Sequence, residues 1–128
     1  MAFTLGVRDS IMIAHSFSGA EFGPAQNMHG ATYTVDCEFG TDKLVDGCNW
    51  VVDIGEALDA LGKCLQAYNY KNLDELPQFK GVNTTTEFMC MQIQKDMAAA
   101  FKGKFSGTIK VTLHESHKAW ASYTGPCS

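Results

Sequence analysis

Glu115 is the residue whose type and position suggest chemistry most directly, because it ends a β-branched run from Ile109 to Ser116. A carboxylate there can accept two parallel hydrogen bonds from the amidine-like edge of a heterocycle, which fixes both the identity and the orientation of the ligand. The alternative is a glutamate that simply ends a strand in solvent, as most exposed glutamates do. Three further segments favour the binding role.

Two histidines add candidates for metal binding or proton transfer. His15 lies in an extended segment, residues 3–17, and His29 lies near the start of a second one, residues 28–39. If both segments are strands, the two histidines can meet across them, with Ala31 on the same face as His29. Two imidazoles alone should hold zinc weakly, since a catalytic zinc site usually has three protein ligands.

Two amphipathic helices are predicted after these strands. Asp53 is a suitable N-cap for the first, whose apolar residues recur every three or four positions to about Ala67. The second is predicted to begin with the capping-box pattern Thr-x-x-Glu at Thr84 and to continue to Phe101. Residues 68–82, between the two helices, are predicted to be irregular.

Two further short strands, residues 108–115 and 119–123, complete the order strand, strand, helix, helix, strand, strand. This order predicts an α+β fold, in which a four-stranded antiparallel sheet carries both helices on one face. Apolar residues in the first two strands indicate that the other face is also covered, and long edge strands invite pairing with another subunit. We therefore expect an oligomer. The apolar residues are Ile11, Ile13, Tyr33 and Val35.

Composition limits the class of protein. The chain has 128 residues, 45% of them hydrophobic, which predicts a single domain over residues 1–128. The net charge is -4 and Arg8 is the only arginine, so nucleic acid is a poor partner. The N-terminal stretch lacks the features of a signal peptide or a membrane span. Five cysteines without a Cys-x-x-Cys pair indicate reduced thiols in a cytoplasmic protein.

Six segments, taken in order, resemble the 6-pyruvoyl-tetrahydropterin synthases and their bacterial relatives, the 6-carboxytetrahydropterin synthases. They are Ile11–His15, Met28–Ala31, Val51–Asp53, Lys71–Asp74, Asn83–Glu87 and Leu113–Ser116. The resemblance implies the tunnelling fold of that family, whose members assemble as homohexamers of two stacked trimers, with the sheets closed into a barrel. It also implies a pterin site between subunits.

By this resemblance, Glu115 is the residue that grips the 2-amino group and the adjacent ring NH of a pterin. Thr85 and Thr86 assist from the start of the second helix, where unpaired backbone NH groups suit the acceptor atoms of a ligand. A plain capping box without a ligand is the alternative interpretation of this helix start.

The family holds zinc with three histidines, and the resemblance places His15, His29 and Ala31 at these positions. Because alanine cannot bind a metal, the resemblance implies a remnant of the zinc site rather than a complete one. A replacement ligand is an open alternative, for which the candidates are Cys37, His114 and Glu21.

The reacting groups of the family are also replaced. Its catalytic cysteine corresponds to Ala25, which has no nucleophile, and its Asp-His pair corresponds to Asn69 and Tyr70. Asn69 lacks the charge of an aspartate, and a tyrosine, with an ordinary pKa of about 10, exchanges protons near neutral pH less readily than a histidine. Asn69 and Tyr70 remain the catalytic candidates at these positions.

These observations predict a divergent homologue that binds a pterin or a similar heterocycle through Glu115, and whose family lyase reaction is absent or changed. One alternative is an active 6-pyruvoyl-tetrahydropterin or 6-carboxytetrahydropterin synthase, a lyase that acts on dihydroneopterin triphosphate with an unusual ligand set. A second alternative is a non-catalytic pterin sensor.

Overall fold

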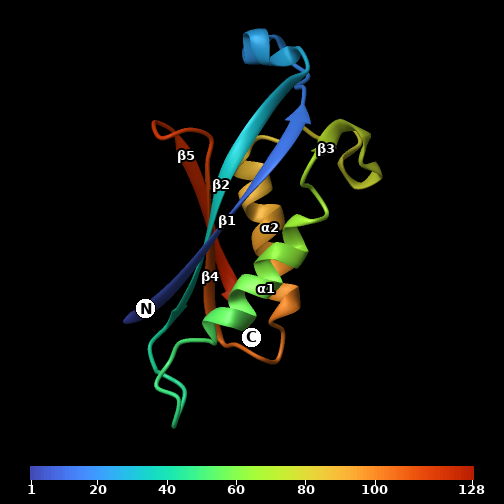
Figure 1. The fold of residues 1–128 in the computed structure, drawn as a ribbon. Coiled ribbons are helices and arrows are strands. Elements are labelled where there is room, and N and C mark those ends of the chain that lie inside the picture. The colour runs from blue at the N-terminus through green and yellow to red at the C-terminus, as the bar shows by residue number, and fades with distance from the viewer.

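The computed structural model describes residues 1–128 and places two helices on one face of a mainly antiparallel sheet (Figure 1). The strands are β1 (Phe3–His15), β2 (His29–Thr41), β3 (Lys71–Asn72), β4 (Gly107–His114) and β5 (Trp120–Cys127). The helices are α1 (Ile54–Leu65) and α2 (Thr86–Ala100), and three short 3-10 segments lie in the connections: η1 (Ala20–Gln26), η2 (Leu73–Glu75) and η3 (Pro77–Phe79). None of these helices combines the length and the apolar character needed to cross a lipid bilayer.

The α+β class and the order of the main elements are confirmed, but the sheet has five strands rather than the four that the sequence predicts. The strand order is β3-β1-β2-β4-β5. The additional strand, β3, has two residues and runs parallel to β1 beside Ile13 and Ala14. A strand of two residues leaves no alternation in the sequence, so the pattern of residues 68–82 could not reveal it.

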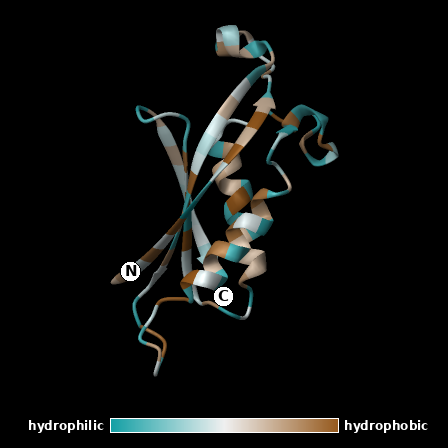
Figure 2. Cartoon of the chain, in the orientation of Figure 1, coloured by the Kyte–Doolittle hydropathy of each residue, from teal (hydrophilic) through white to brown (hydrophobic).

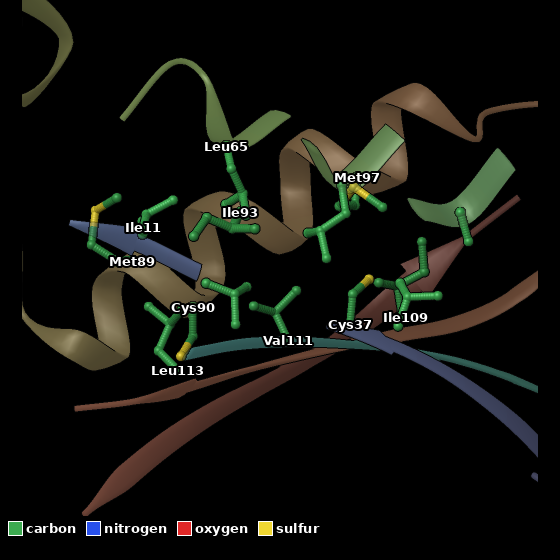
Figure 3. Close-up of a cluster of buried hydrophobic side chains, with 14 of the residues drawn as sticks. Ile11, Cys37, Leu65, Met89, Cys90, Ile93, Met97, Ile109, Val111 and Leu113 are labelled. Carbon is green, nitrogen blue, oxygen red and sulfur yellow. The ribbon is translucent and has the colours of Figure 1, made fainter. Parts of the chain in front are cut away.

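The core lies between the sheet and the helices (Figure 3). Because strand residues alternate between two faces, Cys37, Ile109 and Val111 all point toward α2, where they meet Ile93 and Met97. All five side chains are fully buried. Hydrophobic stretches run along both helices (Figure 2), and burial of this apolar surface is the main favourable contribution that holds the helices on the sheet.

The apolar residues of the first two strands lie on this same helix side, so the prediction that they need a cover on the opposite face is wrong. Ile11, Ile13, Tyr33 and Val35 are each at most 5% exposed in the isolated chain. The physical reason is parity, since odd-numbered residues of β1 and β2 share the face that carries the helices. Folding of a single chain therefore buries these residues, and no second subunit is needed to remove them from solvent.

The face of the sheet that carries no helices, here called the open face, is polar. Arg8 donates two hydrogen bonds to the carboxylate of Asp36 on the neighbouring strand, and His114 Nε2 lies 2.8 Å from the same carboxylate. The hydrogen bond from Arg8 lowers the pKa of Asp36, and the contact with His114 also lowers it. Three polar side chains thus link β1, β2 and β4 across the face that the helices leave open.

Both α-helices begin with a side-chain cap. Asp53 accepts a hydrogen bond from the backbone NH of Gly55 at 2.9 Å, which confirms the first predicted cap. In α2 the cap is Thr85, whose hydroxyl accepts from the NH of Phe88 at 3.2 Å, so the prediction of Thr84 is wrong. The sequence could not distinguish Thr84 from Thr85, because consecutive threonines offer the same capping hydroxyl. In the structure the side chain of Thr84 is buried.

Replacing Thr85 with Ala is expected to lower the free energy of unfolding by about 1 kcal/mol, because the first turn of α2 loses a hydrogen-bond acceptor. Chemical denaturation followed by circular dichroism measures the change. Thr85→Ser keeps the hydroxyl and is the matched control, expected to be much less destabilised. Equal stability of Thr85→Ala and the native protein would contradict the cap assignment.

Candidate functional site

One end of the sheet gathers the residues that the sequence singles out. The end of β1 and the start of β2 flank η1, and the β4–β5 turn and the start of α2 lie at the same end of the molecule (Figure 1). Connections from separate parts of the chain therefore meet there, and they bring together side chains that are distant in the sequence.

His15 and His29 lie side by side at this end. They are Cα partners in the antiparallel register of β1 and β2, and their ring centroids are 4.5 Å apart in an edge-on arrangement. The ring of Phe17 packs against both imidazoles, at centroid distances of 4.6 and 5.5 Å. His15 is 1% exposed, whereas His29 is half-buried. The pair thus has one buried and one solvent-accessible member.

Hydrogen bonds determine which ring nitrogen is free in each histidine. His29 Nδ1 lies 2.9 Å from the carbonyl of Asn27, which can only accept, so Nδ1 carries the proton and Nε2 is bare in the neutral ring. His15 Nδ1 lies 3.1 Å from the hydroxyl of Thr84, and its Nε2 is buried without a hydrogen-bond partner. An unpartnered buried polar atom is uncommon in native proteins and points to a function.

Burial lowers the pKa of His15, because the interior disfavours the imidazolium, and the neighbouring His29 lowers it further. Asp74 acts in the opposite direction and raises this pKa. Its carboxylate is held at the end of β1 by Ser16, through hydrogen bonds of 3.0 Å from the backbone NH and 2.6 Å from the hydroxyl. Since the net shift is downward, His15 is a neutral proton acceptor at physiological pH.

The histidine pair does not by itself provide a full set of metal ligands. The chain contains no group of three His, Cys, Asp or Glu side chains placed to hold a metal, and Ala31 stands opposite Ile13 in the sheet. None of the candidate replacement ligands completes such a group with the histidines: Cys37 is in the core, His114 contacts Asp36, and Glu21 lies in η1, which joins the two histidine strands. The residues present therefore do not fit a three-ligand zinc centre.

Glu115 lies just beyond β4, in the turn that leads to β5, and is exposed in the isolated chain. Its backbone NH donates to the carbonyl of Ala119 at 3.0 Å and so helps to close the turn. The carboxylate has no ion-pair partner within the chain. It borders a polar hollow of about 300 Å³. The hollow is lined by Arg8, Thr32, Thr34, His114, Glu115, Ser116 and His117.

The hollow opens on the face of the sheet that carries no helices, because Thr32, Thr34 and His114 share that face, whereas α2 begins on the opposite face. The hydroxyl of Tyr33 is 3.3 Å from that of Thr86. Burial raises the pKa of Tyr33, the hydrogen bond with Thr86 lowers it, and the charge of Glu115 raises it. Thr85, by contrast, uses its hydroxyl for the helix cap and its NH for the carbonyl of Asn83 at 2.9 Å. Thr86 is therefore the threonine whose hydroxyl contacts Tyr33 and is not used for the cap.

The histidine pair and the Glu115 turn are separated along β2. His29 pairs with His15 near the start of the strand, whereas Thr34 pairs with His114, the residue before Glu115. The intervening residues of an extended strand span roughly 15 Å. A ligand that contacts both groups would therefore have to extend along the direction of β2.

The remaining candidates lie at the edge of β1. The side-chain oxygen of Asn69 accepts from the NH of Met12 at 3.0 Å, and the NH of Tyr70 donates to the carbonyl of Met12 at 2.7 Å. Tyr70 has a φ of 60° and a side chain that is 80% exposed. Asn69 thus extends the hydrogen bonding of the sheet. Ala25 contributes its carbonyl, which accepts from the NH of Phe17 at 3.1 Å.

Sequence reasoning does not identify Thr84 and Tyr33 as parts of this site. It assigns Thr84 to a helix cap and Tyr33 to an apolar face, and the structure adds a polar contact to each. The one available signal is the run of three threonines, because a helix start needs a single cap and leaves the other two hydroxyls for other partners.

Comparison with known proteins identifies one family and one fold. The family model described as 6-pyruvoyl tetrahydropterin synthase matches residues 4–126. A solved 6-pyruvoyl tetrahydropterin synthase from Caenorhabditis elegans is 23% identical, with 96% of this chain and 95% of that chain covered and a TM-score of 0.82. One from Plasmodium vivax is 16% identical, with 97% and 98% covered and a TM-score of 0.77. At these identities the structures support the fold alone. No protein with a curated description matches the chain.

Proposed function

Because this chain belongs to the 6-pyruvoyl tetrahydropterin synthase family, we propose that it binds a pterin or a similar flat heterocycle through Glu115. The observation that carries the proposal is a carboxylate without an ion-pair partner at the rim of a polar hollow. Such a carboxylate is free to accept both NH groups of an amidine-like ring edge, a pairing that is stronger than neutral hydrogen bonds.

The start of α2 offers further polar groups, which the family resemblance assigns to the pterin site. Thr86 adds a hydroxyl, and the first turn of α2 adds backbone NH groups that have no partner within the helix. Thr85 contributes indirectly, because its cap holds the helix start in place. Under this proposal, a heterocycle that reaches from the β4–β5 turn to α2 meets an acceptor on the first and donors on the second.

The reacting side of the site supports binding better than the family lyase reaction. By the family resemblance Ala25 takes the place of the catalytic cysteine, and the side-chain oxygen of Asn69 accepts a hydrogen bond from the NH of Met12. The two histidines have no third metal ligand. We infer that the lyase reaction is absent or severely weakened, and that pterin binding is the activity that remains.

Proton transfer without a metal is the chemistry that these residues could still perform on a bound ligand. His15 has a lowered pKa and a free Nε2, so its neutral ring can accept a proton. Tyr70 is exposed at the sheet edge, where it could take part only with a ligand or a second copy of the chain brought against that edge.

An active synthase is the second candidate function, and one observation favours it. In both histidines Nδ1 is held by a hydrogen bond, to Thr84 and to Asn27, and Nε2 is free. Histidines that bind a metal usually have this arrangement, in which the outer hydrogen bond orients the ring. This candidate requires a third ligand from outside the chain.

We also propose that the chain assembles into the homohexamer of two stacked trimers that the family resemblance implies. The support is the state of the sheet edges, since β5 has no neighbour beyond it and β1 is paired with β3 only at Ile13 and Ala14. Met12, Tyr70 and Trp120 lie on these edge segments and are each at least 51% exposed. Pairing between edges would satisfy the open backbone groups and cover these side chains.

Replacing Glu115 with Gln is expected to weaken pterin binding by about 2 to 3 kcal/mol or more, since a charged hydrogen-bond partner is lost. A titration followed by pterin fluorescence measures the affinity. Glu38→Gln makes the same charge change on the open face of β2 and is the matched control, expected to keep the native affinity. Unchanged affinity of Glu115→Gln for every pterin tested would contradict the site assignment.

Protein purified without chelator is expected to contain well below one zinc per chain, because two neutral imidazoles without a third ligand hold zinc weakly. Elemental analysis measures the content. One zinc per chain that is lost in His15→Ala and kept in His117→Ala would favour the active synthase. Turnover of dihydroneopterin triphosphate with added zinc would then decide between the two functions.

Light scattering of the purified protein is expected to give six times the mass of one chain. Trp120→Glu places a charge on the edge strand β5 and is expected to shift the population toward smaller species, whereas Lys118→Glu, in the exposed turn before it, is the matched control. A native protein that stays monomeric at high concentration would reject the assembly.

A further inference from the structure

Arg8, Asp36 and His114 form a linked group on the open face that pterin binding through Glu115 does not use. The three residues come from β1, β2 and β4. Arg8 Nη2 lies 3.0 Å and His114 Nε2 lies 2.8 Å from the same oxygen, Oδ2 of Asp36. One carboxylate therefore holds a guanidinium and an imidazole close together.

The guanidinium of Arg8 keeps one of its two hydrogen-bonding edges free. Its Nε and Nη2 donate to the two carboxylate oxygens of Asp36, which occupies the edge next to the side-chain stem. The outer edge, formed by Nη1 and the second hydrogen of Nη2, has no partner within the chain, and Asp36 is the only carboxylate that forms an ion pair with Arg8. The side chain is 68% exposed. The outer edge can therefore bind a second carboxylate through two parallel hydrogen bonds.

Two contacts orient the imidazole of His114. Because a carboxylate only accepts hydrogen bonds, the Nε2 of His114 carries the hydrogen that points to Asp36. Trp120, the Cα partner of His114 on β5, packs against the ring at a centroid distance of 5.9 Å. Nδ1 has no partner within the chain, and it accepts in the neutral ring and donates in the charged ring. A ligand hydroxyl suits Nδ1 in both states, since a hydroxyl both accepts and donates.

Arg8 and His114 border the same polar hollow of about 300 Å³ on the open face. Its other lining residues include Thr32, Thr34 and Ser116, which carry hydroxyl groups, and none of the lining residues is hydrophobic. Thr34 is the Cα partner of His114 in the sheet. The hollow thus combines a free guanidinium edge, an oriented imidazole and several hydroxyls.

We propose that this hollow binds a small carboxylic acid that also carries hydroxyl groups, of the sugar-acid class. The ligand carboxylate pairs with the outer edge of Arg8, one ligand hydroxyl bonds to Nδ1 of His114, and the remaining hydroxyls meet the threonines. Asp36 is a positioning residue, which holds both nitrogen groups without contacting the ligand. The proposal does not rest on pterin binding, because it requires no contact with the carboxylate of Glu115.

Three six-carbon probes test the proposal on the native protein. Gluconate has a carboxylate and hydroxyls, hexanoate has the carboxylate alone, and sorbitol has the hydroxyls alone. Each is titrated into nitrogen-labelled protein, and the backbone NMR signals of Arg8, Thr34 and His114 report binding. Gluconate is expected to bind about tenfold more tightly than either of the other probes, because only gluconate uses both groups. Equal affinities, or no change in these signals with gluconate, would overturn the proposal.

Arg8→Lys keeps the positive charge beside Asp36, but an ammonium group cannot form the second two-pronged contact. This variant is expected to bind gluconate about tenfold more weakly than the native protein. Lys110→Gln removes an exposed cation from the same face outside the hollow and is the matched control, expected to keep the native affinity. Equal weakening in both variants would show a general attraction to positive charge and would overturn the proposal.

Glu115→Gln separates this proposal from the proposed function. It is expected to lose pterin binding and to bind gluconate at least as tightly as the native protein, because a negative charge that borders the hollow is removed. A native protein that binds gluconate and no pterin would reject the proposed function alone. Loss of gluconate binding in Glu115→Gln would reject the role of Arg8 and His114 as the binding groups.

Discussion

The antiparallel register of β1 and β2 is the constraint on which the rest of the structure depends. The pairing runs from Phe3 opposite Thr41 to His15 opposite His29, and it places the odd-numbered residues of both strands on the face that carries the helices. A slip of one residue would turn the core side chains and the histidines to the other face. The register that builds the core therefore also builds the histidine pair.

The start of α2 is the second organising element. In three successive residues, Thr84 contacts His15, Thr85 caps the helix, and Thr86 lies beside Tyr33 near the Glu115 turn. The start of a single helix thus contacts both His15 and Tyr33. Because α2 is packed on β4 and β5, a shift in that packing would move the start of α2 and alter both contacts.

Much of the fold could be predicted from the sequence because strand alternation and helical periodicity are local properties. They identify β1, β2 and the capped start of α1 at Asp53, but not β3, which is too short to carry a pattern. Parity shows that Ile11 shares a face with His15, yet which face the helices cover depends on contacts between distant segments. Strand pairing predicts that the two histidines can meet. The sequence does not show which of the three threonines caps α2, because tertiary contacts determine the partner of each hydroxyl.

The polar open face determines which groups a single chain exposes to solvent on that side of the sheet. Arg8, Asp36 and His114 place polar and charged groups across β1, β2 and β4, which interrupts the apolar surface on this face. In the hexamer proposed above, contacts between copies would fall on strand edges, where backbone geometry imposes alignment. Because the core lies within one chain, a copy released from such an assembly would keep its own core intact.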